Sequence, residues 1–413
     1  MTRSQQKRNL RLGVSFVVLL VALGVAQSAL ERSAAAQAKS AVQAPRFEVD
    51  PFWPKPLPNH WLLGMSIGVG VDAQDHVWII HRGAATLNPR TEAGADANPP
   101  IAECCLAAPP VLEFDAAGNL VGHWGGPGSG YEWPESNHGI TIDHKGNVWI
   151  GGNGQNDSHI VKFARDGKFL VQFGHAGARK VSGGEKPAWA GSSLDTENFG
   201  RVAKLFVDPK ANEAYVADGY LNKRVAVIDA DTGKFKRFWG AYGNKPDDTN
   251  LGRYDPDAPV AQQFRNPVHC AELSNDGLVY VCDRPNDRIQ VFQKDGKFVK
   301  EVFIAKRTLG DGSVWDIAFS KDPQQKYLYL ADGKNERVYI LERETLQILT
   351  SFGDGGRQPG QFFAVHSIAT DSKGNIYTTE TYEGKRLQKF VYKGLGPVAA
   401  PNQGVPWPRT SGN

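Results

Sequence analysis

A repeated unit is the feature of this sequence that most limits its fold. One copy runs from His138 to Gly174, and a second runs from His269 to Val302. Each copy contains four short stretches in which apolar and polar residues alternate, separated by tight turns at Asp-Gly or an equivalent pair. Alternation with a period of two is typical of half-buried β-strands, and Asp-Gly is a favoured hairpin turn. The unit is therefore predicted to be a four-stranded sheet.

Further copies of this unit extend over most of the chain. They cover residues 68–125 with a long insertion, 202–240, 315–353 and 365–392. The last copy lacks a clear fourth strand, which the β-prone segment Phe47–Asp50 can supply. A last sheet built from both ends of the chain would close a ring and hide its edges. We therefore predict an all-β fold, a six-bladed β-propeller over residues 47–393; a β-sandwich with a similar number of strands is the alternative.

Composition agrees with this fold and excludes one class of partner. The 45 glycines and 25 prolines suit a chain with many turns, and 10 Trp, 12 Tyr and 20 Phe favour strands. The formal net charge of +3 is too small for the concentrated basic face of a nucleic-acid binder. Three long loops rich in Gly, Pro, Ala and Asp, at residues 83–110, 176–200 and 241–265, are predicted to cover one face of the propeller.

The first 38 residues have the pattern of an export signal. Four basic residues lie within positions 1–12, an uncharged apolar run covers 13–26, and small residues follow up to Ala38. This pattern directs secretion, and an uncleaved signal anchor is the alternative. In both cases we expect the folded part outside the cytoplasm, periplasmic or secreted, with no membrane contact beyond this segment. The Pro- and Gly-rich residues 394–413 are predicted to be a tail.

The four cysteines form two pairs in the sequence, and each pair can be either bonded or free. Cys104 and Cys105 are adjacent in a Pro-rich loop and are either free or joined as a vicinal pair. Cys270 and Cys282 flank the turn at Asn275–Gly277, so they form a cross-strand disulfide if they face each other across a hairpin. Four cysteines fit an oxidising compartment, but they are too few to be the main source of stability in so long a chain.

Three histidines occupy the same register of the repeat. His138 and His366 each lie five residues before an Asp, and His269 lies five residues before the Ser at the matching turn. They belong to the second, fourth and sixth units, whose first strands line the central channel of a propeller. Three imidazoles would thus meet at intervals of about 120° and leave a fourth tetrahedral position open, as in a catalytic zinc site. The alternatives are channel histidines that bond water or a carbonyl, and an inherited site without metal.

Polar residues follow the second strand of several units, at the same mouth of the channel. Arg82, Tyr220 and Arg284 all lie there. An Arg beside a metal is suited to hold a substrate carboxylate, and a Tyr can act as a base if a nearby cation lowers its pKa. The other interpretation is that residues 218–219 form only a turn and that Arg284 or Arg288 is an ion pair within a blade.

The repeats are NHL-like, and the residues quoted above resemble one enzyme family. The combination consists of Ile80–Gly83, His138, Val216–Tyr220, His269, Asp283–Arg284 with Asp287–Gln290, and His366. Together, over residues 47–393, it resembles peptidyl-α-hydroxyglycine α-amidating lyase. The resemblance implies a zinc ion held by His138, His269 and His366. It also implies Arg82 at the substrate, Tyr220 as the base and Arg284 assisting by its charge. The reaction in that family cleaves a carbinolamide N–C bond and releases an amide and glyoxylate.

The sequence departs from this family at three places. The family has an Asp after its third zinc ligand, associated with a calcium ion on the axis, where this chain has Ser367. The backbone carbonyls of Val69 and Ile140 remain calcium candidates with Ser367, but a hydroxyl is a weaker calcium ligand than a carboxylate. Leu221 stands where the family has a disulfide cysteine. No copper monooxygenase domain precedes the propeller, so we expect the substrate to be made by a separate protein or to be a different compound.

Two further functions compete with a lyase. A non-catalytic, extracytoplasmic NHL-type propeller would use its long loops to bind a peptide, a glycan or a protein. A calcium-dependent sugar lactonase has a similar shape, but its site is built from carboxylates and Asn, whereas this channel register offers imidazoles. For the enzyme we expect a small-molecule or peptide substrate and a monomer. The sequence leaves open the substrate, the oligomeric state and whether the signal is cleaved.

Overall fold

The computed structural model describes residues 42–178 and 192–408 and, outside them, only residues 3, 5 and 27. The predicted export segment, residues 1–38, lies outside the described residues except at those three positions. None of the helices in the described parts has the length and apolar character needed to cross a membrane.

Six four-stranded sheets are the main feature of the structure, and each corresponds to one copy of the repeat. Contacts divide the chain into two units, residues 1–44 with 395–399 and residues 45–394 with 400–413. Except for residues 43–44 and 395–397, the blades belong to the second unit, and in each of blades 1 to 5 the strands follow one another in chain order from the first, innermost strand. Their bounds are β3 Ser66–Val71, β4 Val77–His81, β6 Val111–Phe114 and β7 Leu120–Trp124 in blade 1; β8 Asn137–Ile142, β9 Val148–Gly152, β10 His159–Phe163 and β11 Phe169–Gly174 in blade 2; β12 Val202–Asp208, β13 Glu213–Asp218, β14 Arg224–Asp229 and β15 Phe235–Trp239 in blade 3; β16 Val268–Leu273, β17 Leu278–Asp283, β18 Arg288–Gln293 and β19 Phe298–Phe303 in blade 4; and β20 Asp316–Phe319, β21 Tyr327–Asp332, β22 Arg337–Glu342 and β23 Ile348–Phe352 in blade 5.

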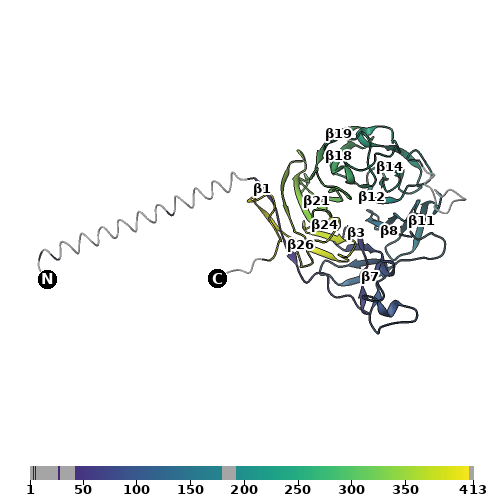
Figure 1. The fold of residues 1–413 in the computed structure, drawn as a ribbon, viewed down its shortest axis with the longest axis horizontal. Coiled ribbons are helices and arrows are strands. Elements are labelled where there is room, and N and C mark those ends of the chain that lie inside the picture. Colours follow the sequence, from purple (N-terminus) through teal and green to yellow (C-terminus); the bar gives the residue numbers. More distant parts are fainter. Residues whose placement is uncertain (1–2, 4, 6–26, 28–41, 179–191, 409–413) are drawn as a thin grey trace. The chain divides into compact units, whose positions relative to one another are not determined.

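The sixth blade joins the two ends of the repeat region. It contains β24 (Val365–Thr370), β25 (Ile376–Glu380), β26 (Leu387–Pro397) and, beside β26, β1 (Gln43–Asp50). Each innermost strand contacts the innermost strand of the next blade, and β24 contacts β3, which closes the ring (Figure 1). The predicted six-bladed propeller is confirmed, including its closure by the strand that contains Phe47–Asp50, and the β-sandwich alternative is wrong.

The turn between the first and second strands shows why the repeat folds in this way. In blade 2, Asp143 accepts a hydrogen bond of 2.9 Å from the Trp149 indole Nε1, which fastens the turn to the second strand. Gly146 in this turn has a φ of +80°, a conformation that costs glycine little and other residues much more. The pairing of an Asp with an aromatic side chain recurs in blade 1, at Asp72 with Trp78, and in blade 6, at Asp371 with Tyr377.

Apolar side chains fill the space between neighbouring blades. One buried cluster, for example, combines Tyr215 and Val227 of blade 3 with Val281 and Phe292 of blade 4. Since the blades bury their apolar faces against each other, the axis-facing positions of the innermost strands do not have to be apolar.

The connections between strands contain short elements and one of the two disulfides. The short elements are β2 Trp61–Leu62, β5 Leu106–Ala107, and the 3-10 helices η1 Gly83–Thr86, η2 Gly94–Asp96, η3 Ala241–Gly243 and η4 Arg284–Asn286. Cys104 and Cys105 form a disulfide within the first long loop, and Cys270 and Cys282 form one between β16 and β17. In both pairs the bonded alternative is therefore the one that the structure contains.

Candidate metal centre

The innermost strands share an irregularity at one register. In five blades the pairing between the first and second strands skips one or two residues, as in a β-bulge. The skipped residues are Ile67, His138 with Gly139, Ala203, His269 and His366. A bulge re-aims the side chain and takes backbone groups out of the ladder. Three of the five bulges fall on the histidines that the repeat placed in one register.

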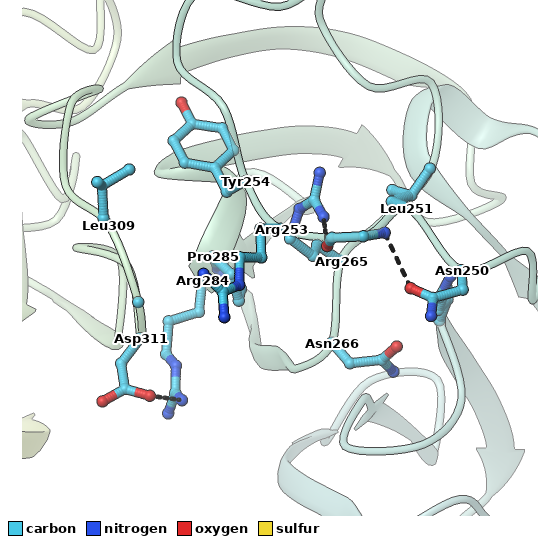
Figure 2. A pocket seen from close by; sticks show the side chains of 13 residues that line it. Asn250, Leu251, Arg253, Tyr254, Arg265, Asn266, Arg284, Pro285, Leu309 and Asp311 are labelled. Atoms are coloured by element: carbon cyan, nitrogen blue, oxygen red, sulfur yellow. Dashed lines mark hydrogen bonds and ion pairs between the residues drawn. The ribbon is translucent and has the colours of Figure 1, made fainter.

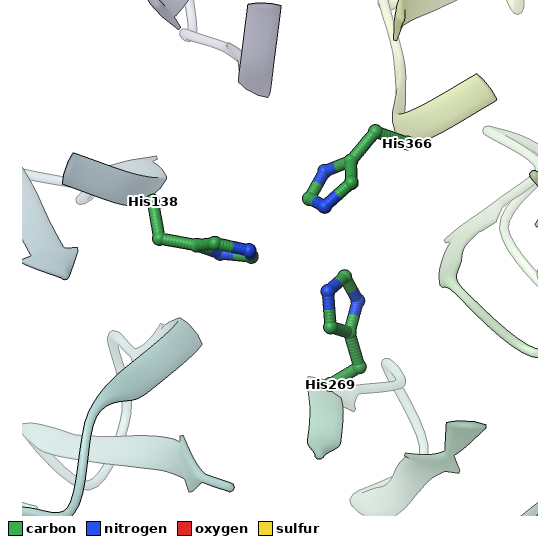
Figure 3. Close-up of side chains that lie close together, drawn as sticks. All are labelled: His138, His269 and His366. Carbon is green, nitrogen blue, oxygen red and sulfur yellow. The ribbon is translucent and has the colours of Figure 1, made fainter. Parts of the chain in front are cut away.

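These three imidazoles, called the imidazole level below, converge on the axis of the propeller from blades 2, 4 and 6 (Figure 3). One ring nitrogen from each of His138, His269 and His366 lies within 4.8 Å of the others. The residues are only 2%, 3% and 4% exposed. A void of about 10 Å³ borders all three side chains, which is about the space that a single water or small ion needs.

The second nitrogen of each ring is fixed by the neighbouring blade. The Nδ1–H groups of His138, His269 and His366 donate to backbone carbonyls at 2.7, 2.5 and 2.6 Å. The acceptors are Ala203 O, Trp315 O and Ile67 O, which belong to blades 3, 5 and 1. Since a carbonyl can only accept, each Nδ1 carries the proton and each Nε2 keeps its lone pair. A backbone carbonyl on the far nitrogen is the usual support of a metal-binding histidine.

Burial keeps the three rings neutral. It is the largest cause that lowers the pKa of His366 to about 3, followed by the charge of Arg284. Burial and then the neighbouring His366 place the pKa of His138 well below its usual value, and burial and then Arg284 do the same for His269. Neutral imidazoles with free Nε2 lone pairs are the form that binds a metal ion.

Tyr220 and Arg284 reach the same point. The Tyr220 hydroxyl lies 2.8 Å from His138 Nε2 and 3.1 Å from His269 Nε2, although one hydroxyl can donate to only one of them. Arg284 is 6% exposed, and its Nη1 donates to Tyr220 Oη at 3.4 Å. The Arg284 guanidinium lies 4.5 Å from the centre of the Trp315 ring, which holds it in place by a cation–π contact.

Arg82 lies at the rim of the same mouth without a direct bond to the imidazoles. Its Nε donates to Asn137 O at 3.2 Å and its Nη2 donates to Asn153 Oδ1 at 2.7 Å. Burial lowers the pKa of Arg82, and no carboxylate in the described parts of the chain forms an ion pair with it. The preceding His81 is buried and has both nitrogens bonded to backbone groups, so it fixes the turn that presents Arg82.

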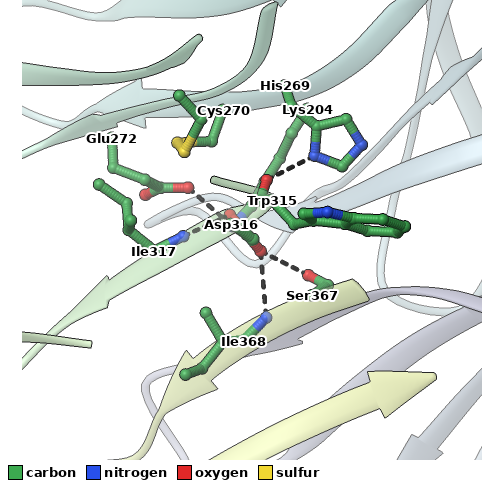
Figure 4. The surroundings of a disulfide bond; sticks show 10 residues. Lys204, His269, Cys270, Glu272, Trp315, Asp316, Ile317, Ser367 and Ile368 are labelled. Atoms are coloured by element: carbon green, nitrogen blue, oxygen red, sulfur yellow. Dashed lines mark hydrogen bonds and ion pairs between the residues drawn. A yellow bond between two sulfur atoms is a disulfide. The ribbon is translucent and has the colours of Figure 1, made fainter. Parts of the chain in front are cut away.

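A second cluster, called the ionic level below, lies further along the innermost strands. Lys204 comes one residue after Ala203, and Glu272 comes three residues after His269. Lys204 Nζ is 2.9 Å from both Asp316 carboxylate oxygens and 2.8 Å from Glu272 Oε1 (Figure 4). Asp316 also accepts a hydrogen bond of 2.7 Å from Ser367 Oγ. Burial alone would lower the pKa of Lys204, but the two carboxylates outweigh it and raise the pKa. The sequence pattern did not single out this cluster, whose one visible signal was a lysine inside a channel strand.

The ionic level bears on whether the residues suggested as calcium ligands fit a calcium ion. The hydroxyl proton of Ser367 is donated to Asp316, and the nearest cation to that carboxylate is the Lys204 ammonium. Val69 N–H donates to Ser367 Oγ at 3.3 Å, while Val69 and Ile140 also border a wider cavity of about 340 Å³ further along the channel. Because the two carboxylates are already paired with an ammonium, these residues do not fit a calcium ion.

The comparisons with known proteins agree with the repeat and the site. No family model matches the chain. The chain is 31% identical over 253 residues to peptidyl-glycine alpha-amidating monooxygenase B of Xenopus laevis, which covers 59% of this chain and 25% of that protein. It is 24% identical over 261 residues to a probable peptidyl-alpha-hydroxyglycine alpha-amidating lyase of Caenorhabditis elegans, covering 61% and 63%. It is 24% identical over 371 residues to NHL repeat-containing protein 3 of Mus musculus, covering 85% of each. The chain is a distant homologue of the amidating proteins and of NHL repeat-containing proteins.

The homology has a limited extent. The chain spans about a quarter of the length of the two amidating monooxygenases of Xenopus laevis. A streptogramin B lyase structure superposes with a TM-score of 0.51 at 11% identity, covering 84% of this chain and 98% of that one. The superposition shows that the two chains share the propeller fold.

Other charged groups of this chain form ion pairs with each other. Arg288 is fully buried and donates to Asp283 at 2.7 Å, so of the two arginines considered in the sequence it is Arg288 that packs within the blade. A second group with the residue types of a metal site, Asp72, His76 and Glu113, is bridged by Arg165, whose guanidinium contacts both carboxylates. Among the described residues, no cationic side chain bonds a ring nitrogen of the imidazole level in this way.

Proposed function

We propose that this protein is an extracytoplasmic, zinc-dependent lyase that cleaves the N–C bond of a hydroxylated amide. The substrate would be a peptidyl-α-hydroxyglycine or a related 2-hydroxy acid amide, and the products an amide and glyoxylate. The observation that carries the proposal is the set of three buried, neutral imidazoles whose Nδ1 atoms are held by backbone carbonyls. Such a set, with a hydroxyl and a guanidinium beside it, suits catalysis better than it suits packing. The two disulfides support an oxidising compartment.

The donor set fits zinc. His138, His269 and His366 would hold the ion through Nε2, and three nitrogen ligands with a free fourth position are the usual composition of a catalytic zinc site. When bound, the ion supplies a Lewis acid that polarises a substrate oxygen and makes its proton easier to remove.

The residues of the chain supply the proton transfer and the binding of charge. Tyr220 Oη takes the proton of the substrate hydroxyl, the electron pair of that O–H bond becomes the carbonyl bond of glyoxylate, and the C–N bond breaks. The departing amide nitrogen takes a proton back from Tyr220, so the reaction needs no water and no oxidant. Tyr220 is a phenolate before it takes the proton and again after it returns it, and Arg284, 3.4 Å from Tyr220 Oη, stabilises that phenolate. Arg82 pairs with the substrate carboxylate, since no carboxylate of the described chain pairs with it.

Metal content and glyoxylate release test this function together. Protein prepared in zinc-supplemented medium should contain about one zinc per chain, and His269→Ala should contain almost none. Wild type should release glyoxylate from an α-hydroxyglycine peptide, and Tyr220→Phe should be slower by about 10²–10⁴-fold while keeping its zinc. His81→Gln is the matched control for the zinc measurement, because His81 is a buried histidine outside the imidazole level. Zinc-free wild type, or equal inactivity of wild type and Tyr220→Phe on peptide and ureido substrates, would overturn the proposal.

A second candidate is a non-catalytic NHL-type propeller that binds a peptide, a glycan or a protein. It is supported by the match to NHL repeat-containing protein 3, which covers 85% of both chains, whereas the match to the amidating monooxygenase covers 25% of that protein. The zinc measurement separates the two candidates, because a binding module has no need of the metal.

A further inference from the structure

A pocket of about 540 Å³ opens between the loops of blades 3, 4 and 5 (Figure 2). One of its lining residues, Arg284, also bonds Tyr220 beside the imidazole level. Its cationic side chains are Lys223, Arg253, Arg265 and Arg284, and its one carboxylate is Asp311. The long loop 241–265 supplies two of these arginines, so the insertion that the sequence placed over one face of the propeller forms a wall of this pocket.

The positive charges of the pocket are mostly unpaired. Asp311 Oδ1 lies 3.6 Å from Arg284 Nη2, a weak contact to the one cation that it reaches. In the described parts of the chain, Lys223, Arg253 and Arg265 form no ion pair with any carboxylate. Their hydrogen bonds go to neutral oxygens: Arg265 donates to Asn286 Oδ1 and Gly252 O, and Lys223 donates to Thr249 O.

The excess of positive charge in the pocket is energetically costly because some of the cations are buried. Lys223 is 6% exposed, and burial lowers its pKa, as it lowers the pKa of Arg265. Cations without a direct ion pair in a partly desolvated site raise the free energy of the folded chain. The charges of Asp247, Asp248 and Asp283 offset part of this cost, and an anionic ligand would offset more of it. Arg253 and Arg265 both line the pocket, and guanidinium groups can hold planar or tetrahedral anions through paired N–H donors.

Arg284 connects this pocket with the reacting centre. Its guanidinium lines the pocket and also contacts Tyr220 Oη, while its Nε is buried without a hydrogen-bond partner. A substrate whose hydroxyl lies at Tyr220 would therefore extend past Arg284 into the pocket with the part of the molecule on its amide side.

We propose that this pocket selects substrates that carry an anionic group on the amide side of the scissile bond, that is, acidic peptidyl-α-hydroxyglycines. The proposal rests on the proposed lyase function and adds the substrate class. The anion, a side-chain carboxylate or a phosphate, would be bound by Arg253 and Arg265 at one end while the glycine carboxylate is bound by Arg82 at the other.

The experiment compares pairs of probes that differ only in charge. The zinc-loaded full chain is given N-acetyl-Glu-α-hydroxyglycine, N-acetyl-Gln-α-hydroxyglycine and the phosphoserine and serine counterparts, and kcat/KM is measured from glyoxylate. We expect the anionic member of at least one pair to be preferred by about tenfold, and the preference to fall towards one in Arg253→Gln and Arg265→Gln. Lys168→Gln is the matched control: Lys168 is exposed and lies in the β10–β11 turn, at the far end of the strands from the pocket loops. Arg253 is exposed and forms no ion pair with the residues that the structure describes, so its replacement should not affect folding.

A binding measurement separates failure of this inference from failure of the proposed function. The uncleavable N-acetyl-Glu-Gly and N-acetyl-Gln-Gly are titrated into wild type and Arg253→Gln by calorimetry. Tighter binding of the Glu peptide to wild type alone supports the pocket even if no hydroxyglycine is cleaved. Equal binding and equal kcat/KM for the charged and neutral members of both pairs would overturn the inference while leaving the lyase function intact.

Discussion

The two levels of the central channel contain polar groups of opposite kinds. At the ionic level, Lys204 is bonded to Asp316 and Glu272, so its charge is compensated inside the protein. At the imidazole level, by contrast, backbone carbonyls bond only the Nδ1 side of the three rings, and among the described side chains only the Tyr220 hydroxyl reaches Nε2 atoms, those of His138 and His269. The ionic level is therefore complete without a ligand, while the imidazole level keeps binding capacity for one.

The backbone of the innermost strands sets the geometry of the imidazole level. The bulges that turn the histidines of blades 2, 4 and 6 towards the axis also occur at Ile67 and Ala203 of blades 1 and 3. In those blades the carbonyl, not the side chain, is used at this register, and it accepts an Nδ1–H. Alternate blades thus supply the binding nitrogens and the groups that orient them. The alternation becomes visible only when the same register is compared in several blades.

The largest effect is expected at the ionic level. Lys204→Met removes the ammonium and leaves two carboxylates facing each other in the channel, so the free energy of unfolding should fall by about 3–5 kcal/mol. Denaturant unfolding measures this loss, and Asp316→Asn in the same chain should restore part of it. Zinc content should remain near one per chain. Loss of zinc from a folded Lys204→Met variant would show that the two levels are one unit and would break the comparison.

The next effect concerns the support of the imidazole level. The Cys270–Cys282 disulfide follows His269 directly and precedes Asp283 and Arg284, and it spans 12 residues. Replacing both cysteines by Ser should lower the free energy of unfolding by about 3 kcal/mol, since a loop of this size costs about that much entropy to close. Thermal unfolding with and without reductant checks the result. Zinc affinity should fall in parallel, whereas the same change at Cys104 and Cys105 should leave zinc affinity as it is.

His81 sharpens the distinction between a buried histidine that binds and one that supports. Burial lowers the pKa of His81 to about 4, and the hydrogen bond to Pro109 O opposes this only in part. Below the ordinary pKa of about 6.5 the unfolded chain takes up a proton that the folded chain refuses, so stability falls as the pH drops from about 6.5 towards 4. This residue accounts for about 2 kcal/mol of the loss at pH 5. Between pH 8 and pH 5, the free energy of unfolding of His81→Gln should fall by about 2 kcal/mol less than that of wild type, as measured by denaturant titrations. Identical slopes for both proteins would contradict the assignment.

The smallest effect is expected from calcium. With Lys204 paired at the ionic level, neither millimolar calcium nor a calcium-selective chelator should move the Tm by more than about 1 °C. In the double variant Lys204→Met and Ser367→Asp, three carboxylates replace the neutralised cluster, and calcium should then raise the Tm. A calcium-dependent Tm in wild type would show that the cluster does not exclude the ion.

Much of the fold could be read from the chain because each blade is specified locally. The Asp-aromatic pair of Asp143 and Trp149, the glycine at the turn and the alternation of strands lie within one copy of the repeat, so they are visible without its neighbours. The common register of the three histidines was visible for the same reason. The extent of a pocket such as the one around Arg253 was not, because its lining comes from loops of three blades whose course no local pattern specifies.

The sequence by itself determined the six blades, the strand that closes the ring and the alternate blades that carry imidazoles, because these depend on spacing within a repeat. The tertiary structure alone decided that Lys204 of blade 3 meets Glu272 of blade 4 and Asp316 of blade 5, and that carbonyls of the odd blades orient the rings of the even ones. Such contacts join residues tens of positions apart through the closure of a ring. Their distances depend on the stagger and twist of neighbouring blades, which no single repeat contains.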